Sequence, residues 1–174
     1  MSEIETKRLR IIALTMEQLQ QYLTDRVRLE RQLDVSLSQG VITQALRRAI
    51  AIKLTKMTQA APRYHDWYTY WLMVVSEDAF GAGLVGFKGY PSPAGEAELG
   101  YGIDPAYRNQ GYTTEAVRAL IGWAFQHPEC TSVIGEVKKS NPASSRVLQK
   151  GGMRLFYETE DAVYWMIRKG RDSG

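Results

Sequence analysis

The chain has 174 residues, of which 44% are hydrophobic and 24% are charged, as is usual for a water-soluble globular protein. Its net charge of +3 is too small an excess for a nucleic-acid-binding protein, and it suits a polyanionic cofactor at least as well. With one cysteine the chain cannot form an internal disulfide, and with only two histidines besides it a metal site is not expected. The sequence has no long apolar run and no secretion signal, which predicts a cytoplasmic protein that does not enter membranes.

The first half of the chain predicts one strand, a helical insert and then a run of strands. Residues 8–14 predict a strand, and residues 15–60 predict two or three helices. Aromatic and valine residues predict a strand over residues 68–76, and residues 83–90 are its expected hairpin partner. A turn rich in proline then leads into the strand Glu98-Leu99-Gly100-Tyr101-Gly102-Ile103.

The second half alternates strands with helices. Ala116, Leu120 and Ala124 recur every four residues and predict a half-buried helix. After it we expect a strand over residues 132–137, a short helix over residues 141–152, and strands over residues 153–157 and 163–168. This order predicts a mixed α/β sheet in a single domain over residues 1–170, followed by a frayed tail over residues 171–174.

The segment Arg108-Asn109-Gln110-Gly111-Tyr112-Thr113-Thr114-Glu115 joins a predicted strand to the start of a predicted helix. The first turn of a helix has N–H groups without backbone partners and a partial positive charge, so it stabilises an anion such as a pyrophosphate. Gly111 lets the backbone approach closely, Arg108 adds a cation, and the hydroxyls of Thr113 and Thr114 can cap or donate. An ordinary capped helix is the alternative interpretation.

A second segment, residues 141–152, is a short helix with clear boundaries. Asn141 is expected at the N-cap, Pro142 at the first helical position and Lys150 near the end, with a glycine just beyond. It lies one strand and one helix after the predicted anion loop.

Together the two segments resemble the GNAT superfamily of acetyl-CoA-dependent N-acetyltransferases. The pyrophosphate loop of that family, Q/R-x-x-G-x-G/A, is matched by Arg108 and Gly111, with Thr113 in place of the small residue. The chain is most similar to the branch that acetylates N-termini of ribosomal proteins, strongly over residues 98–153, fairly over residues 5–14 and weakly over residues 25–66. The resemblance implies an α+β fold with a mostly antiparallel central sheet flanked by helices, acetyl-CoA as cofactor, and a small-molecule or peptide amine as acceptor.

The resemblance also implies a set of cofactor-binding residues. The backbone of the strand end would meet the pantetheine amides, the anion loop would hold the pyrophosphate, and an asparagine would orient the pantetheine arm. These residues are Tyr101, Gly102, Ile103, Arg108, Asn109, Gln110, Gly111, Tyr112, Thr113, Thr114 and Asn141.

Acetyl transfer requires a neutral amine and a proton for the departing thiolate. Glu98 is the expected base, because its strand ends beside the loop and family members often use a glutamate there, and Glu96 is the alternative. Many members carry a tyrosine seven residues after the asparagine, and it acts as the general acid that protonates the thiolate. This chain has Leu148 there, so we expect Ser144 to be the acid, either directly or through a water. The ordinary interpretations are a solvent-facing Glu98 and a Ser144 bonded to its own backbone.

The acceptor is not specified by any motif. Aromatic residues alternate over residues 67–71, and we expect one side of them in the core and the other in an acceptor groove or a homodimer contact. A ribosomal-protein N-terminus, a polyamine, an amino acid and a drug all remain open as acceptors. A CoA-binding module without turnover, and an acyltransferase for a longer acyl chain or a hydroxyl acceptor, are the alternative functions.

One further glycine pattern suggests a nucleotide site. Gly81-Ala82-Gly83-Leu84-Val85-Gly86 fits the dinucleotide fingerprint G-x-G-x-x-G. Strand and turn residues follow it instead of a helix, so we predict a plain hairpin.

Overall fold

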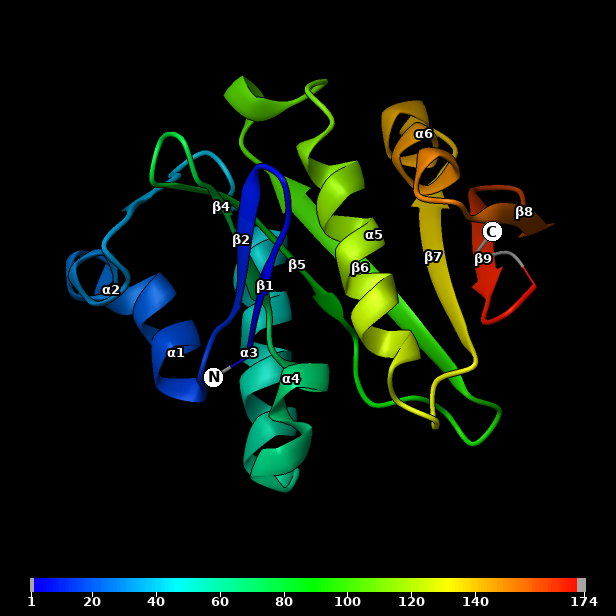
Figure 1. The fold of residues 1–174 in the computed structure, drawn as a ribbon, viewed down its shortest axis with the longest axis horizontal. Helices are drawn as coiled ribbons and strands as arrows, with labels where there is room; N and C mark the ends of the chain where they lie inside the picture. Colours follow the sequence, from blue (N-terminus) through cyan, green and yellow to red (C-terminus); the bar gives the residue numbers. More distant parts are fainter. Residues whose placement is uncertain (1, 172–174) are drawn as a thin grey trace.

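A nine-stranded sheet runs through the computed structural model, which describes residues 2–171 (Figure 1). Along the sheet the strands are β1 (Glu3–Glu5), β2 (Leu9–Ala13), β4 (Trp71–Val75), β5 (Phe80–Phe87), β6 (Glu96–Ile103), β7 (Ser132–Lys138), β9 (Ala162–Arg168) and β8 (Arg154–Glu158), and β3 (Ser36–Leu37) pairs with β5. Only β6 with β7 and β3 with β5 are parallel among the described pairs. The mixed, mostly antiparallel sheet is as predicted, while residues 172–174 of the expected tail lie outside the described residues.

Helices cover both faces of this sheet. The helical insert forms α1 (Met16–Thr24), α2 (Arg26–Leu33) and α3 (Gln44–Gln59), and the second half forms α5 (Tyr112–Phe125) and α6 (Pro142–Lys150); the short helices are η1 (Pro62–Tyr64), α4 (His65–Tyr68) and η2 (Pro105–Tyr107). Because successive strand residues point to opposite faces, Ile11 of β2 packs in the core beneath α5, and Ile12 packs with α1, α2 and α3. Each face therefore has its own core.

Local sequence explains where the helices begin. Thr15 and Gln18 form a reciprocal capping box at the start of α1, and Asp25 and Thr43 cap α2 and α3. In α5 the residues that recur every three or four positions are buried, as predicted from their spacing. No helix within residues 2–171 is long and apolar enough to cross a membrane.

The aromatic segment before β4 differs from the prediction. Trp67 and Tyr68 belong to α4 and the strand begins only at Trp71, so the predicted alternation over residues 67–71 is wrong. The Trp67 ring packs 5.0 Å from the ring of Phe87 and 4.6 Å from that of Trp123. This tertiary packing outweighs the preference of aromatic residues for strands.

The glycine pattern at residues 81–86 lies inside β5, and the chain continues as strand and turn instead of helix. A Cβ atom at Gly83 would lie 2.3 Å from the carbonyl oxygen of Gly102 on β6. Close contact between neighbouring strands therefore explains this glycine, as expected for a hairpin.

Candidate active site

The strands β6 and β7 pair over only part of their length. Four residue pairs join them, from Glu96–Ser132 to Leu99–Gly135, although β6 continues to Ile103 and β7 to Lys138. Figure 1 shows the two strands diverging toward the end of the sheet where α5 and α6 begin. Residues 100–103 stay paired with β5 on one side, so their other edge presents N–H and C=O groups that no described strand uses.

The predicted anion loop lies next to this open edge and leads into α5. Gly111 at the N-cap has φ +83°, and Asn109 is also left-handed at φ +59°. No side chain among the described residues caps α5, so the ordinary capped helix that the sequence allowed is not observed, and Thr113 is buried. The first-turn N–H groups therefore remain available to an anion, beside the exposed Arg108.

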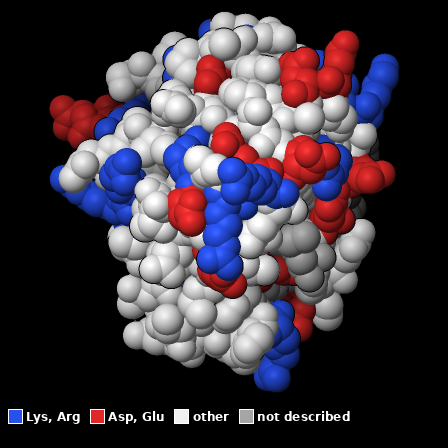
Figure 2. All heavy atoms as spheres, turned by 90° about the vertical axis from the view of Figure 1, so that its left-hand side faces the viewer, with Lys and Arg blue, Asp and Glu red and all other residues white. Residues whose placement is uncertain are grey.

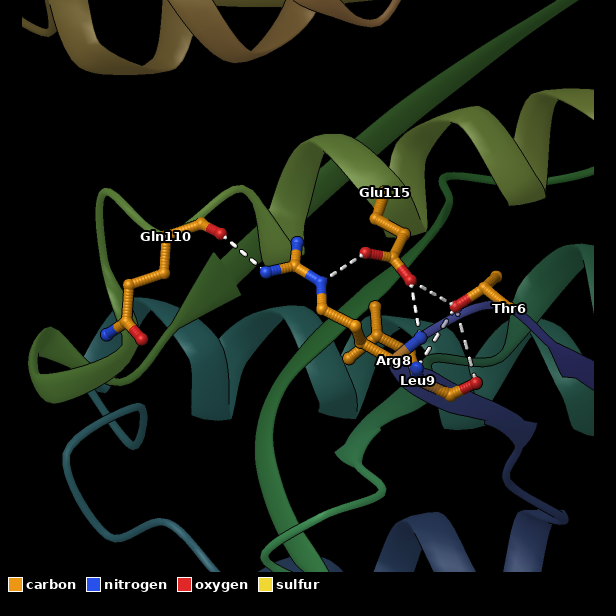
Figure 3. A network of polar contacts seen from close by, with 5 residues as sticks. All are labelled: Thr6, Arg8, Leu9, Gln110 and Glu115. Atoms are coloured by element: carbon orange, nitrogen blue, oxygen red, sulfur yellow. Dashed lines mark hydrogen bonds and ion pairs between the residues drawn. The ribbon is translucent and has the colours of Figure 1, made fainter.

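Arg8, the residue before β2, contacts this loop with its side chain (Figure 3). Its Nη1 donates to the carbonyl oxygen of Gln110 at 2.8 Å, and its Nε donates to Glu115 at 2.7 Å. The guanidinium also lies 4.3 Å from the centre of the Tyr112 ring. Sequence reasoning missed this role, although Arg8 belongs to the opening segment that supports the family resemblance.

Glu115 on α5 anchors the same network. Its carboxylate accepts hydrogen bonds from Thr6 Oγ1 at 2.6 Å and from the backbone N–H of Arg8 at 2.9 Å, besides the ion pair. Burial on its own raises the pKa of Glu115, but the hydrogen bonds and charge from Thr6 and Arg8 outweigh it and lower the pKa below its usual value. The charged carboxylate therefore ties α5 to the segment before β2.

On the other side of the opening, α6 carries Ser144. Asn141 caps the helix as predicted, because its Oδ1 accepts from the backbone N–H of Ser144 at 3.2 Å. The Ser144 hydroxyl lies 2.6 Å from the phenol of Tyr101 on β6, and that phenol donates to the Ser144 carbonyl oxygen at 3.0 Å. Either hydroxyl can be the donor between the two, because the phenol proton can point to the Ser144 hydroxyl or to the Ser144 carbonyl oxygen.

Tyr101 brings a side chain to the site where only its backbone was expected. Burial raises the pKa of its phenol to about 12, although the hydrogen bond with Ser144 acts in the opposite direction. Its direction could have been read from β6, since Ala97 and Leu99 are buried beneath α5 and Tyr101 continues the same face. Leu148, where the family often has tyrosine, is buried in the core and offers no proton donor.

Glu98 lies on the opposite face of β6 from Tyr101. Its carboxylate is paired with the ammonium of Lys88 on the neighbouring chain segment, and its side chain is 34% exposed. Glu96, the alternative base, is exposed at the start of the strand. The structure therefore places Glu98 and Ser144 on opposite faces of the sheet, and no described contact joins them.

A buried lysine lies behind the Lys88 segment. Lys53 of α3 is 6% exposed, and its Nζ donates to the carbonyl oxygens of Phe87 and Tyr68 while lying 4.4 Å from the centre of the Tyr70 ring. Burial, with the nearby charges of Lys56 and Lys88, lowers its pKa to about 7. Lys56 of the same helix donates to the carbonyl oxygen of Lys88 at 2.9 Å, so α3 holds the end of β5.

Comparison with known proteins identifies the family of this fold. The family model described as Acetyltransferase (GNAT) domain matches residues 8–154, from the first long strand to the start of β8. The chain belongs to the GNAT acetyltransferase family. Within the described residues no group of three His, Cys, Asp or Glu side chains could hold a metal ion.

Two relatives from Bacillus subtilis (strain 168) match parts of this GNAT chain. It is 27% identical to "Uncharacterized N-acetyltransferase YjdG" over 55% of this chain and 57% of that protein. It is 35% identical to "Uncharacterized N-acetyltransferase YnaD" over 33% of this chain and 34% of that protein. The chain thus spans less than two thirds of either relative.

Solved structures share the fold over nearly the whole length. The ribosomal-protein-S5-alanine acetyltransferase from Vibrio fischeri aligns over 100% of both chains with a TM-score of 0.68 and 15% identity. RimL, a ribosomal L7/L12 alpha-N-protein acetyltransferase in complex with coenzyme A, aligns over 96% of this chain and 98% of its own with a TM-score of 0.66 and 16% identity. A GNAT-family acetyltransferase from Bacillus anthracis covers the same shares with a TM-score of 0.64 and 21% identity.

Proposed function

We propose that this chain is an acetyl-CoA-dependent N-acetyltransferase that transfers an acetyl group to a primary amine by direct attack in a ternary complex. The open edge of β6 beside the uncapped start of α5 carries this proposal. A free strand edge binds amide groups and a helix N-terminus binds a pyrophosphate, and coenzyme A has both groups. Membership of the GNAT family and the coenzyme A complex of RimL support it.

The residues of this chain fit the cofactor. A Cβ atom at Gly100 would meet no other heavy atom within 4 Å, and one at Gly102 would meet only Val41 at 3.8 Å, so space remains over the face of β6 that carries Glu98. Bound acetyl-CoA would supply an acetyl thioester. We assign Tyr101, Gly102 and Ile103 to the pantetheine amides, Asn141 to the pantetheine arm, and Arg108, Asn109, Gln110, Gly111, Tyr112, Thr113 and Thr114 to the pyrophosphate.

Glu98 is the proposed general base. The last residue pair of β6 and β7 is Leu99–Gly135, and the pair of Glu98 comes directly before it, at the edge of the opening. The pair of Glu96 is the first of the four and lies farther from the opening. The ion pair with Lys88 shows that the carboxylate can hold an ammonium group. An acceptor amine would compete with Lys88 for these oxygens and lose its proton there.

The demand on this base depends on the amine. An α-amine has a pKa near 7.7–8.0, so neutralising it at pH 7 costs about 1 kcal/mol, whereas a lysine amine with a pKa near 10.4 costs roughly 4 kcal/mol. The base therefore matters much more for a lysine or a polyamine than for an N-terminus.

Ser144 is the proposed acid, supported by Tyr101. When the phenol donates to the serine oxygen, the serine proton is available to the departing thiolate, and the raised pKa keeps the phenol protonated at neutral pH. A proton given up by Ser144 could be replaced from Tyr101 through the same contact.

The proposed acceptor is a protein N-terminal α-amine, which also implies action in the cytoplasm. Ribosomal-protein acetyltransferases among the structural neighbours support this choice. Figure 2 shows Lys and Arg interspersed with Asp and Glu on the face that carries α1 and α2, so this face is not the uniformly basic surface expected for a nucleic-acid acceptor.

A pH profile of thiol release from acetyl-CoA tests the proposal. The acceptors are a short peptide with a free N-terminus and blocked lysines, spermidine, and an acetyl-blocked lysine peptide. For the α-amine peptide, kcat/KM should level off not far above pH 8 and persist at a reduced level in Glu98→Gln. Glu96→Gln is the matched control on the same strand, and it should retain wild-type rates.

Other outcomes separate the alternatives. Coenzyme A binding without thiol release on any amine would indicate a binding module, and preference for succinyl-CoA or a longer donor would indicate a different acyltransferase. Faster turnover of spermidine or lysine than of every α-amine peptide would overturn the acceptor assignment while leaving the cofactor assignment intact.

A further inference from the structure

A glutamate of β7 lies where the opening between β6 and β7 begins. The last pair of the two strands is Leu99–Gly135, so Glu136 is the first residue of β7 beyond it. The next residue, Val137, is buried in the core beneath α5. Because side chains alternate along a strand, Glu136 points to the opposite face of the sheet, where it is exposed.

This is the face that carries Glu98. Glu98 pairs with Ile134, and residues that are paired across two strands, or two apart on one strand, share a face. Glu136 is therefore separated from Glu98 by one strand spacing and two residues along the strand. Two glutamate side chains can span this separation and contact one group between them.

The helices that cover this face do not extend over β7. The core beneath α1, α2 and α3 contains residues of β2, β4 and β5, and no described residue of β7 or β9 belongs to it. Figure 1 shows the three helices near β2 and β4 and away from β7 and β9. An acceptor can therefore reach Glu136 without displacing a helix, while a cofactor occupies the free edge of β6.

The carboxylate of Glu136 has no cation beside it. Glu98 is paired with Lys88, whereas no Lys or Arg of the described chain lies at ion-pair distance from Glu136. Even Lys138, two residues further along the same face of β7, makes no ion pair with it. An ammonium group from outside the chain can therefore bind Glu136 without breaking an existing ion pair.

The neighbour of Glu136 across β7 and β9 is Tyr164. Burial raises the pKa of the Tyr164 phenol, and the negative charges of Glu136 and Glu98 raise it further. Both carboxylates are thus close to one hydroxyl that remains neutral. This hydroxyl can donate to a carboxylate and orient it, but it does not neutralise the charge.

We propose that Glu136 binds the ammonium group of the acceptor and places it beside Glu98. This role rests on the proposed amine acetylation and adds a specificity-determining residue to it. Glu136 holds the protonated amine by a charge-assisted hydrogen bond, and one N–H proton then passes to the Glu98 carboxylate, which leaves a neutral amine to attack the thioester. The acceptors selected in this way are amines that are cationic when they bind.

Two unreactive peptide analogues measure this contact without turnover. In the first the N-terminal amine carries two methyl groups, so it stays cationic but cannot form an amide; in the second a hydrogen atom replaces the amine. Calorimetric titration in the presence of coenzyme A should show the cationic analogue binding roughly tenfold more tightly to the wild type. In Glu136→Gln this ratio should fall by about fivefold or more, and in Glu136→Lys it should fall further because the charges repel.

Glu158→Gln is the matched control. Glu158 is an exposed glutamate of β8, but it pairs with Val163, whose side chain packs against the core beneath α5, so it lies on the other face of the sheet. This variant should keep the wild-type ratio, and circular dichroism with coenzyme A titration should show that all variants are folded.

The outcomes separate this role from the proposed function. A wild type without preference for the cationic analogue, an unchanged ratio in both Glu136 variants, or an equal fall in Glu158→Gln would overturn the role of Glu136, even if the wild type acetylates amines. Failure of the proposed function would instead appear as a wild type that releases no thiol from acetyl-CoA with any amine.

Discussion

The phenol of Tyr101 on β6 and the hydroxyl of Ser144 on α6 lie 2.6 Å apart and join the two sides of the opening between β6 and β7. The residues are 43 positions apart in the chain, and their contact depends on α6 returning to the face that also carries α5. A proton donor is thereby placed at the opening even though Leu148 occupies the position of the usual tyrosine.

Removal of this donor pair should slow catalysis without weakening cofactor binding. Ser144→Ala should lower kcat by roughly 10²–10⁴-fold, and Tyr101→Phe should lower it less, because it leaves the serine in place. The double variant should be little worse than Ser144→Ala, since the two groups act in series. Steady-state kinetics and calorimetric titration with coenzyme A measure both quantities.

Ser145→Ala is the matched control on the same helix, because the Ser145 hydroxyl contacts Trp165 instead of Tyr101. It should leave kcat unchanged. A loss of less than about threefold in Ser144→Ala would reject the assignment of the acid.

A charge at the start of α5 should abolish coenzyme A binding. Gly111→Glu places a carboxylate where the pyrophosphate is proposed to lie, and it also forces a side chain onto a residue with φ +83°. The matched control is Gly122→Glu, at an exposed glycine later in the same helix where a Cβ atom would meet nothing within 4 Å. If calorimetry gave the same affinity for both folded variants, the pyrophosphate site would be misplaced.

Two arginines of the N-terminal segment allow a similar comparison. Arg8 and Arg10 each have a side chain 39% exposed and each make a 2.7 Å ion pair, but only Arg8 contacts the loop before α5. Arg8→Met should weaken coenzyme A binding by about tenfold through loss of loop positioning. Arg10→Met should leave the dissociation constant within twofold, and equal effects would show that the Arg8 network does not serve the cofactor loop.

Lys53 should make stability depend on pH. With a pKa of about 7 in the folded protein and near 10.4 in the unfolded chain, the unfolded state binds more protons between these values, so stability rises with pH there. Lys53→Met lacks this titration. The free energy of unfolding of the wild type relative to Lys53→Met should therefore rise by roughly 1 kcal/mol per pH unit between pH 7 and pH 9.

Urea unfolding at several pH values measures this difference, with Lys56→Met as the control for an exposed lysine of the same helix. Parallel stability profiles for the wild type and Lys53→Met would show that Lys53 is not titrating in this range.

Much of the fold follows from local sequence, because local interactions produce it. The buried stripe of α5, the caps of α1 and α6 and the glycine at the start of α5 are each encoded within a few residues. The strands β1 and β3 have three and two residues, too few to show a period, so sequence alone did not reveal them. The four-residue helix α4 was missed because packing of Trp67, not propensity, determines it.

The backbone shape of the loop before α5 was predictable from the sequence, and the side-chain contacts around it were not. The loop before α5 is a continuous motif, whereas the contacts of Arg8 with Glu115, Lys88 with Glu98 and Tyr101 with Ser144 join distant segments. These contacts depend on strand order and on which face each residue takes. Periodicity within one segment does not contain that information.

The hydrogen bond between Thr6 and Glu115 joins residues that are 109 positions apart. During synthesis the segment before β2 leaves the ribosome long before α5 has been made, and contacts of such long range form late. The contacts that hold the loop before α5 against the segment before β2 can therefore form only after most of the chain has left the ribosome. Coenzyme binding would then stabilise finished molecules and not nascent ones.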